Sequence, residues 1–252
     1  MIIDRPAKYQ LPELCSLWCE AFGDTEEFFS IFLESAYSED RCRCLTLDGS
    51  VAAALYWFDC ECEGQRIAYL YAIATRAEHR GKGLCRALME NTHAQLRALG
   101  YTAALLVPSE PSLFGFYEKM GYKASSGIGE LFCRAADEKA ALISVGKDEY
   151  AALRRAYLPE FSVIQENENL DFLAEQSSLY RGDEFLLASR IQDGKVFGLE
   201  LLGDTKKASE IVAALGCAEG YFRTVGNDRP FAMIFALSEK CPHTTHFGFA
   251  FD

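Results

Sequence analysis

A glycine-rich turn between two apolar runs constrains this chain more than any other feature. The residues from Arg66 to Thr75 predict a buried strand, and apolar residues at helical spacing after Gly83 predict a helix. Between them, the segment RGKGLC (residues 80–85) contains two glycines, which permit a close approach of the backbone to a ligand. The first N–H groups of a helix have no partner within it, and they form a positive dipole end. The stretch therefore predicts an anion site, with a pyrophosphate as the first hypothesis.

The charges around this turn agree with a phosphate ligand, although the chain as a whole is acidic. Arg80, Lys82 and Arg86 supply three cations, and no carboxylate lies between His79 and Met89. The net charge of −12 over 252 residues excludes general nucleic-acid binding or docking on anionic lipid, which need a wide basic face. A cationic or amine-bearing substrate fits this balance better.

The ends and the cysteines of the sequence predict a cytoplasmic protein with no membrane partner. No apolar run approaches the roughly 20 residues of a membrane helix, and residues 1–6 lack the layout of a signal peptide. The ten cysteines are then expected to be reduced thiols. Cys241, His243 and His246 match no standard zinc spacing, so we expect a loop there and no metal.

The turn lacks the spacing of the dinucleotide and nucleoside-triphosphate loops. It resembles instead the acetyl-CoA loop of the GNAT superfamily of N-acetyltransferases, whose pattern [RQ]-x-x-G-x-[GA] falls on Arg80, Gly83 and Cys85. Cys85 departs from the usual glycine or alanine. The alternative is a basic glycine turn that only caps a helix. A second segment, FYEKMGY (residues 116–122), is similar to the family's other hallmark, F-Y-[EK]-K-x-G-[FY].

The predicted order of elements also resembles the GNAT fold. Residues 1–136 read as strand, helix, helix, three strands, the glycine loop, helix, strand, helix and strand. The expected strands are 1–3, 42–47, 50–58, 66–75 and 101–107, and the expected helices are 12–22, one capped by Asp24 or Thr25, one after the loop and one from Pro111. The resemblance implies an α/β (α+β) fold with a mixed central sheet.

The resemblance also implies roles for particular residues. Tyr117 stands where the family places the tyrosine that protonates the departing coenzyme A thiolate, although its spacing also suits a core aromatic. The backbone N–H near Ile73 is expected to stabilise the tetrahedral oxyanion, because the family's strand splays from its neighbour there. The implied acetyl-CoA site comprises Ile73, Ala74, Thr75, Arg80, Gly81, Lys82, Gly83, Leu84, Cys85 and Arg86.

The general base and the acceptor site are less well defined by the sequence. No histidine or carboxylate lies between Tyr69 and Thr75, so deprotonation of the amine stays unassigned. Four aromatic residues either line the acceptor site or belong to the core, and the core is the commoner place for them: Trp18, Trp57, Tyr69 and Tyr71.

Residues 137–252 read as a degenerate copy of the first domain, with a structural or acceptor-binding role. Expected helices at 147–157, 169–180 and 204–215 alternate with strands at 142–145, 184–192, 195–202, 220–225, 231–237 and 247–251. In place of a phosphate loop stands LLGDT (residues 201–205), in which Asp204 would repel a pyrophosphate at a helix N-terminus.

These features predict a tandem GNAT-like enzyme. The expected reaction moves an acetyl group from acetyl-CoA to an amine of a small molecule or peptide by direct attack in a ternary complex. The alternative is a non-catalytic acyl-CoA-binding or regulatory protein on the same fold, since no base is assigned. The acceptor and the oligomeric state are left open by the sequence.

Overall fold

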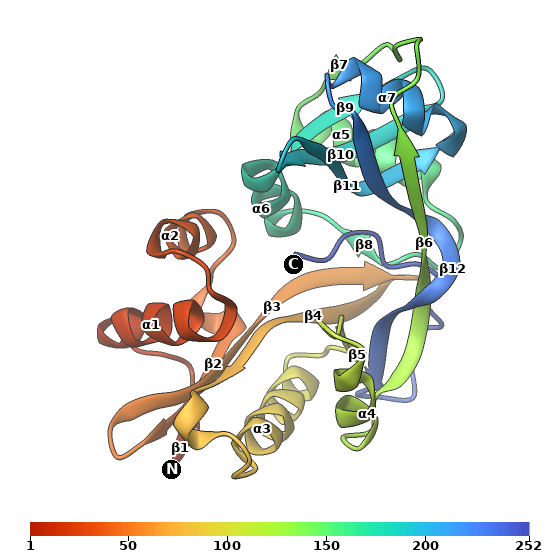
Figure 1. Cartoon of the computed structure of the whole chain (residues 1–252). Coiled ribbons are helices and arrows are strands. Elements are labelled where there is room, and N and C mark those ends of the chain that lie inside the picture. The colour runs from red at the N-terminus through yellow and green to blue at the C-terminus, as the bar shows by residue number, and fades with distance from the viewer. Residues whose placement is uncertain (252) are drawn as a thin grey trace.

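The computed structural model describes residues 1–251 and contains two groups of helices and strands in chain order (Figure 1). The first group is β1 (Ile2–Asp4), α1 (Leu11–Phe22), α2 (Glu26–Ser35), β2 (Cys42–Leu47), β3 (Ser50–Cys62), β4 (Gln65–Thr75), α3 (Leu84–Ala98), β5 (Ala103–Leu106), α4 (Ser112–Glu118) and β6 (Lys123–Arg134). The second group is β7 (Ile143–Ser144), α5 (Lys147–Tyr157), β8 (Ile164–Gln165), α6 (Glu168–Gln176), β9 (Ser178–Arg181), β10 (Phe185–Gln192), β11 (Lys195–Gly203), α7 (Ala208–Ala214) and β12 (Glu219–Ala236).

The turn between α1 and α2 follows from local chemistry. Gly23 ends α1 in the left-handed conformation, with φ of 75°, which costs glycine little. The hydroxyl of Thr25 accepts a hydrogen bond from the N–H of Phe28 at 3.2 Å and caps α2. Asp24 has a different partner, because its carboxylate accepts the indole N–H of Trp18 at 2.8 Å. Thr25 is therefore the cap, and Asp24 holds a core tryptophan.

All twelve strands join in one mixed sheet. Its order is β1-β2-β3-β4-β5-β12-β11-β10-β9-β7, with β6 paired to β12 and β8 paired to β3. The β2–β3 and β3–β4 pairs are antiparallel, whereas β4–β5 and β11–β12 are parallel. The mixed α/β architecture expected from the sequence is confirmed.

Two long strands, β6 and β12, connect the halves of the molecule (Figure 1). β12 lies beside β11 from Gly220 to Thr224 and beside β5 from Met233 to Ala236. β6 runs antiparallel to β12 through both parts, with Arg134 opposite Glu219 at one end. Each of the proposed units, 1–136 and 137–252, therefore contributes a strand to the other's part of the sheet.

Three expectations for the second half are wrong. The predicted strands 220–225 and 231–237 form one long strand, because β6 pairs with both. The predicted helix 169–180 ends at Gln176, and Ser178–Arg181 form β9 because they pair with β10. The segment Phe247–Phe251 is buried but lies outside the sheet, although its alternating phenylalanines predict a strand.

The two halves share one apolar core. The ring of Phe172 on α6 lies 5.8 Å from Phe28 and 5.4 Å from Phe32, both on α2. Phe251 lies 4.8 Å from Phe172 and 4.9 Å from Phe58 on β3. Because these residues are largely buried, we expect the halves to unfold together.

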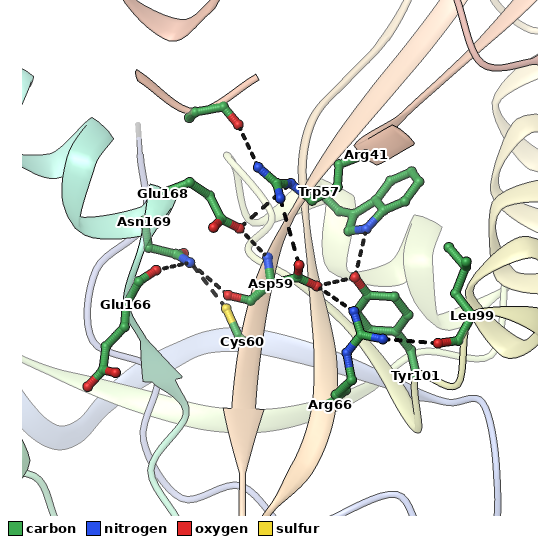
Figure 2. Close-up of polar contacts among 11 residues, drawn as sticks. Arg41, Trp57, Asp59, Cys60, Arg66, Leu99, Tyr101, Glu166, Glu168 and Asn169 are labelled. Atoms are coloured by element: carbon green, nitrogen blue, oxygen red, sulfur yellow. Dashed lines mark hydrogen bonds and ion pairs between the residues drawn. The ribbon is translucent and has the colours of Figure 1, made fainter. Parts of the chain in front are cut away.

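A polar cluster around Asp59 on β3 fastens the same junction (Figure 2). The backbone N–H of Asp59 donates to the carboxylate of Glu168 at 2.8 Å, and the amide of Asn169 donates to the carbonyl of Asp59 at 2.8 Å. The carboxylate of Asp59 accepts from the Tyr101 hydroxyl and faces Arg41 at 3.8 Å. The start of α6 is thus held against the outer end of β3 by backbone as well as side-chain contacts.

We expect Asn169→Ala to lower the free energy of unfolding by about 2 kcal/mol, because it removes the buried side-chain amide that donates to the carbonyl of Asp59. Asn169 is fully buried and also donates to the carbonyl of Glu166 at 3.1 Å. Urea titration measures the change, with Arg155→Ala as a control, since Arg155 makes only an exposed pair with Glu166. Equal unfolding midpoints for Asn169→Ala and the parent would show that the junction is not held here.

Candidate active site

The strands β4 and β5 part in the middle of the sheet. They pair in parallel only from Ile67 opposite Ala103 to Tyr69 opposite Leu105. β4 then continues to Thr75 with β3 as its remaining partner among the described strands. From Leu70 onward, the edge of β4 that faces β5 is open, so its backbone groups are available to a ligand.

A bulge in β4 lies at this opening. Ala72 and Ile73 together oppose Leu55, between the pairs Tyr71–Tyr56 and Ala74–Ala54. Ala72 has a φ of 48°, a strained value for a residue with a side chain. Bulges of this kind redirect backbone and side chains, and Ile73 lines the cavity described below. The backbone of β4 is thus distorted next to Ile73, the residue whose N–H is predicted to stabilise the oxyanion.

The glycine loop connects the end of β4 to α3. Gly81 and Gly83 have φ values of 74° and 78°, which strain any other residue even though open space surrounds both. Gly83 is the N-cap of α3 and has no side chain to cap the first N–H groups. The loop is exposed, so these N–H groups face solvent at the positive end of a 15-residue helix.

The three predicted cations surround this helix end and are all exposed. The guanidinium of Arg80 donates to the carbonyl of Thr75 at 3.0 Å, which folds its side chain back across the loop. Arg86 donates to the carbonyl of Lys119 at 3.1 Å and connects α3 to the end of α4. Of the remaining predicted residues, Ala74 and Leu84 point into the core, so only their backbone groups face the loop.

Glu20 on α1 holds the start of the loop, a role that the sequence does not predict. Its carboxylate accepts from the N–H of Ala77 at 2.8 Å and pairs with Arg76 at 2.8 Å. The N–H of Ala77, helped by Arg76, lowers the pKa of Glu20. Arg76 also donates to the carbonyl of Val51 at 2.9 Å. Nothing near Glu20 in the sequence indicates this contact, because its partners are 56 and 57 residues away.

A cavity of about 370 Å³ opens beside the parted strands. Its walls come from α1, the turn before α2, the end of β4, the segment after β5, α4 and the second half of the chain. The residues that line it include Trp18, Phe22, Asp24, Phe28, Tyr69, Leu70, Tyr71, Ala72, Ile73, Leu106, Leu113 and Tyr117. The predicted catalytic residues Ile73 and Tyr117 therefore lie on one cavity.

Tyr117 is both a buried aromatic and a cavity residue. Its side chain is 7% exposed and its ring lies 5.8 Å from that of Tyr122. Burial, with a contribution from Cys85, raises the pKa of the Tyr117 hydroxyl above its usual value. Burial likewise raises the pKa of Cys85, to about 11. The phenol is therefore protonated at neutral pH, which is the state that a proton donor requires.

Three of the four candidate acceptor aromatics line the cavity and also belong to the core: Trp18, Tyr69 and Tyr71. Trp57 does not, because its indole N–H donates to the hydroxyl of Tyr101 at 3.3 Å on the other face of the sheet (Figure 2). Among residues 1–251, Asp24 is the one residue lining this cavity that carries a carboxylate.

The second half of the chain completes the cavity, through residues that the sequence did not single out. Gln176 of α6, Arg190 of β10 and the pair Ala250 and Phe251 line it. These residues lie more than 50 positions from any residue of the first half that lines the cavity. Only the aromatic alternation of Phe247–Phe251 marks this segment as one that is buried.

The second half has no equivalent of the glycine loop after β11. Asp204 accepts from the N–H of Lys206 at 3.1 Å and donates its own N–H to the carbonyl of Glu184 at 2.8 Å. A Cβ at Gly203 would lie 2.2 Å from that carbonyl oxygen. The turn is thus closed on Glu184, and Asp204 places a carboxylate in it.

Residues 1–251 contain no group of three or more His, Cys, Asp or Glu side chains placed to hold a metal ion. Cys241 lies against the carbonyl of Pro242, and His246 lies 3.9 Å from Glu200. In the same range, every helix is too short or too polar to cross a bilayer.

The parted strands, the glycine loop and the tyrosine on one cavity form the arrangement that the sequence predicts for an acyl-CoA-dependent acyltransferase. The family model of the acetyltransferase (GNAT) domain matches residues 3–125, which agrees with this arrangement. Those residues belong to the GNAT superfamily, as the two sequence motifs indicated. No curated protein matches the chain.

Solved structures show that the GNAT-type fold extends over nearly the whole chain. A GCN5-related N-acetyltransferase from Kribbella flavida superposes with a TM-score of 0.70 at 16% identity, over 94% of this chain and 72% of that one. A GCN5-related N-acetyltransferase from Anabaena variabilis superposes with a TM-score of 0.72 at 12% identity, over 94% of this chain and 73% of that one. A tandem GNAT protein from the clavulanic acid biosynthesis pathway superposes with a TM-score of 0.60 at 10% identity, over 95% of this chain and 99% of that one.

Proposed function

We propose that the first half of the chain, residues 1–136, transfers an acetyl group from acetyl-CoA to an amine of a small molecule or peptide, with both substrates bound together. Residues 137–252 act as a degenerate GNAT-like unit that supports the fold and the acceptor site. The observation that carries the proposal is the single cavity that joins the open edge of β4 at Ile73 to Tyr117.

The coenzyme would lie along β4 and end at the loop. The N–H groups of Gly81, Gly83 and the first turn of α3 face solvent and suit the pyrophosphate, with Arg80 and Lys82 adding charge. The open backbone of Ile73–Thr75 suits the amide groups of the pantetheine arm. Leu84, Cys85 and Arg86 contribute as the first turn of the helix. The chemistry of this path suits acetyl-CoA.

The reaction would take place where β4 bulges. The amine attacks the thioester carbon, and the N–H near Ile73 stabilises the oxyanion of the tetrahedral intermediate. The carbon–sulfur bond then breaks, and Tyr117 gives its proton to the leaving thiolate. The proton that the attacking nitrogen loses passes through solvent to the tyrosinate and restores Tyr117. Asp24 favours the approach of a cationic acceptor, which must lose a proton before it attacks.

We expect acetyl-CoA to raise the melting temperature, and NAD and ATP at equal concentration to raise it much less. A hundredfold excess over the dissociation constant contributes about 2.7 kcal/mol, which is an easily measured shift. Titration calorimetry should give one acetyl-CoA per chain, because the second half carries Asp204 on a closed turn. Equal shifts for the three nucleotides, or two equivalent sites, would contradict the assignment.

A further inference from the structure

We propose that the second half of the chain sets the acceptor selectivity of the first. It does so by fixing the segment Phe247–Phe251 as one wall of the cavity, through a buried anchor of Arg154, Gln165 and Glu200. The inference rests on the proposed function, and it assigns positioning residues that lie outside the cavity itself.

The segment Phe247–Phe251 runs between the two halves, where Figure 1 marks the C-terminus. The ring of Phe251 lies 5.8 Å from Tyr71, and that of Phe247 lies 4.8 Å from Tyr69. Ala250 and Phe251 line the cavity, as do Phe22 and Asp24 from the end of α1 and the turn after it. The shape of the acceptor side therefore depends on where this segment lies.

Gln165 on β8 replaces the strand partner that the segment lacks. Its side-chain amide donates to the carbonyl of Phe249 at 2.7 Å and accepts the N–H of Phe249 at 3.2 Å. Both residues are fully buried, so neither bond competes with water. β8 pairs with β3, and this fixes the amide relative to the first half.

Beneath the segment lies a buried ion pair. Arg154 on α5 donates to both carboxylate oxygens of Glu200 on β11, at 2.8 and 2.9 Å, and its guanidinium lies 4.7 Å from the centre of the Phe249 ring. Burial opposes the charge of Glu200, but Arg154 and His246 outweigh it and lower the pKa to about 2. The pair is thus charged at neutral pH.

Gly248 lets the backbone pass directly over this pair. A Cβ at that position would lie 2.0 Å from Oε1 of Glu200 and 2.3 Å from a guanidinium nitrogen of Arg154. Any side chain at position 248 must therefore displace the segment or break the pair. Ion pair, amide and glycine together specify one path for the segment.

The anchor is separate from the coenzyme side. Arg154, Gln165 and Glu200 belong to the second half and do not line the cavity as described, whereas the glycine loop belongs to the first half. Loss of the anchor should loosen the wall at Phe251 and leave the loop intact. We therefore expect kcat/KM for amines to change and the dissociation constant of acetyl-CoA to stay the same.

The test compares Gln165→Met with Arg155→Ala, a control from the neighbouring exposed pair. Gln165→Met keeps the length of the side chain and removes both hydrogen bonds to Phe249 and the 3.5 Å bond from Arg154. The readouts are kcat/KM for 2-phenylethylamine relative to methylamine and the dissociation constant of acetyl-CoA. For Gln165→Met we expect the ratio to change about tenfold, with acetyl-CoA binding within about twofold of the parent. An unchanged ratio, or a matching loss of acetyl-CoA binding, would overturn the proposal.

Hydrogen exchange separates failure of the anchor from failure of the proposed function, because it requires no turnover. Peptides that cover Phe247–Phe251 should exchange at least about tenfold faster in Gln165→Met and at the parent rate in Arg155→Ala. Gly248→Ala provides a second variant with the same expected result if Gln165→Met does not fold. Parent-like exchange in the folded variants would contradict the anchor, whereas absence of transfer to every amine would contradict the proposed function.

Discussion

Replacement of Tyr117 by phenylalanine is expected to lower kcat by about 100-fold or more and to leave acetyl-CoA binding nearly unchanged. The variant keeps the ring that packs against Tyr122 and removes only the hydroxyl. The loss arises in the transition state, because the departing thiolate no longer receives a proton. Single-turnover kinetics measures the chemical step apart from product release.

Tyr122→Phe is a suitable control, since Tyr122 is a fully buried neighbour of Tyr117 that does not line the cavity. Its hydroxyl forms a hydrogen bond with the ring of His93 at 2.8 Å. Because burial raises the pKa of Tyr117, the parent should not lose its proton donor between about pH 7 and pH 9. If Tyr117→Phe retains the parent rate of the chemical step, this tyrosine is a core residue only.

Removal of one loop cation, by Arg80→Ala or Lys82→Ala, should raise the dissociation constant of acetyl-CoA about 10- to 150-fold. Charge-assisted contacts to phosphate contribute about 1.5–3 kcal/mol each. The same binding should weaken with added salt. Lys240→Ala, an exposed cation far along the chain, is the matched control for charge. Parent-like affinity in both loop variants would place the phosphates elsewhere.

Local patterns in the sequence were enough to predict most of the first half. The alternation in Cys42–Leu47 and the turn at Asp48-Gly49 predict a hairpin that the structure contains, with Gly49 at a φ of 91°. The glycine loop likewise depends on residues adjacent in the chain. Such features are readable because their causes lie within a few residues.

The parts that were not predicted depend on contacts between distant residues. β12 is one strand because β6 spans both of its ends, and no local signal distinguishes that from two short strands. Phe247–Phe251 alternates like a strand, but its backbone at Phe249 bonds a glutamine side chain 84 residues away. The same holds for Asp24, whose place in the cavity follows from the packing of α1 against α2 and β4.

The most direct test of the central claim is the release of free coenzyme A thiol from acetyl-CoA in the presence of a panel of primary amines. The account predicts thiol release that depends on the amine, saturates with it and matches the amount of N-acetylated product. Binding of one acetyl-CoA per chain without thiol release for any amine would contradict it and favour a protein that binds the coenzyme without transferring its acetyl group.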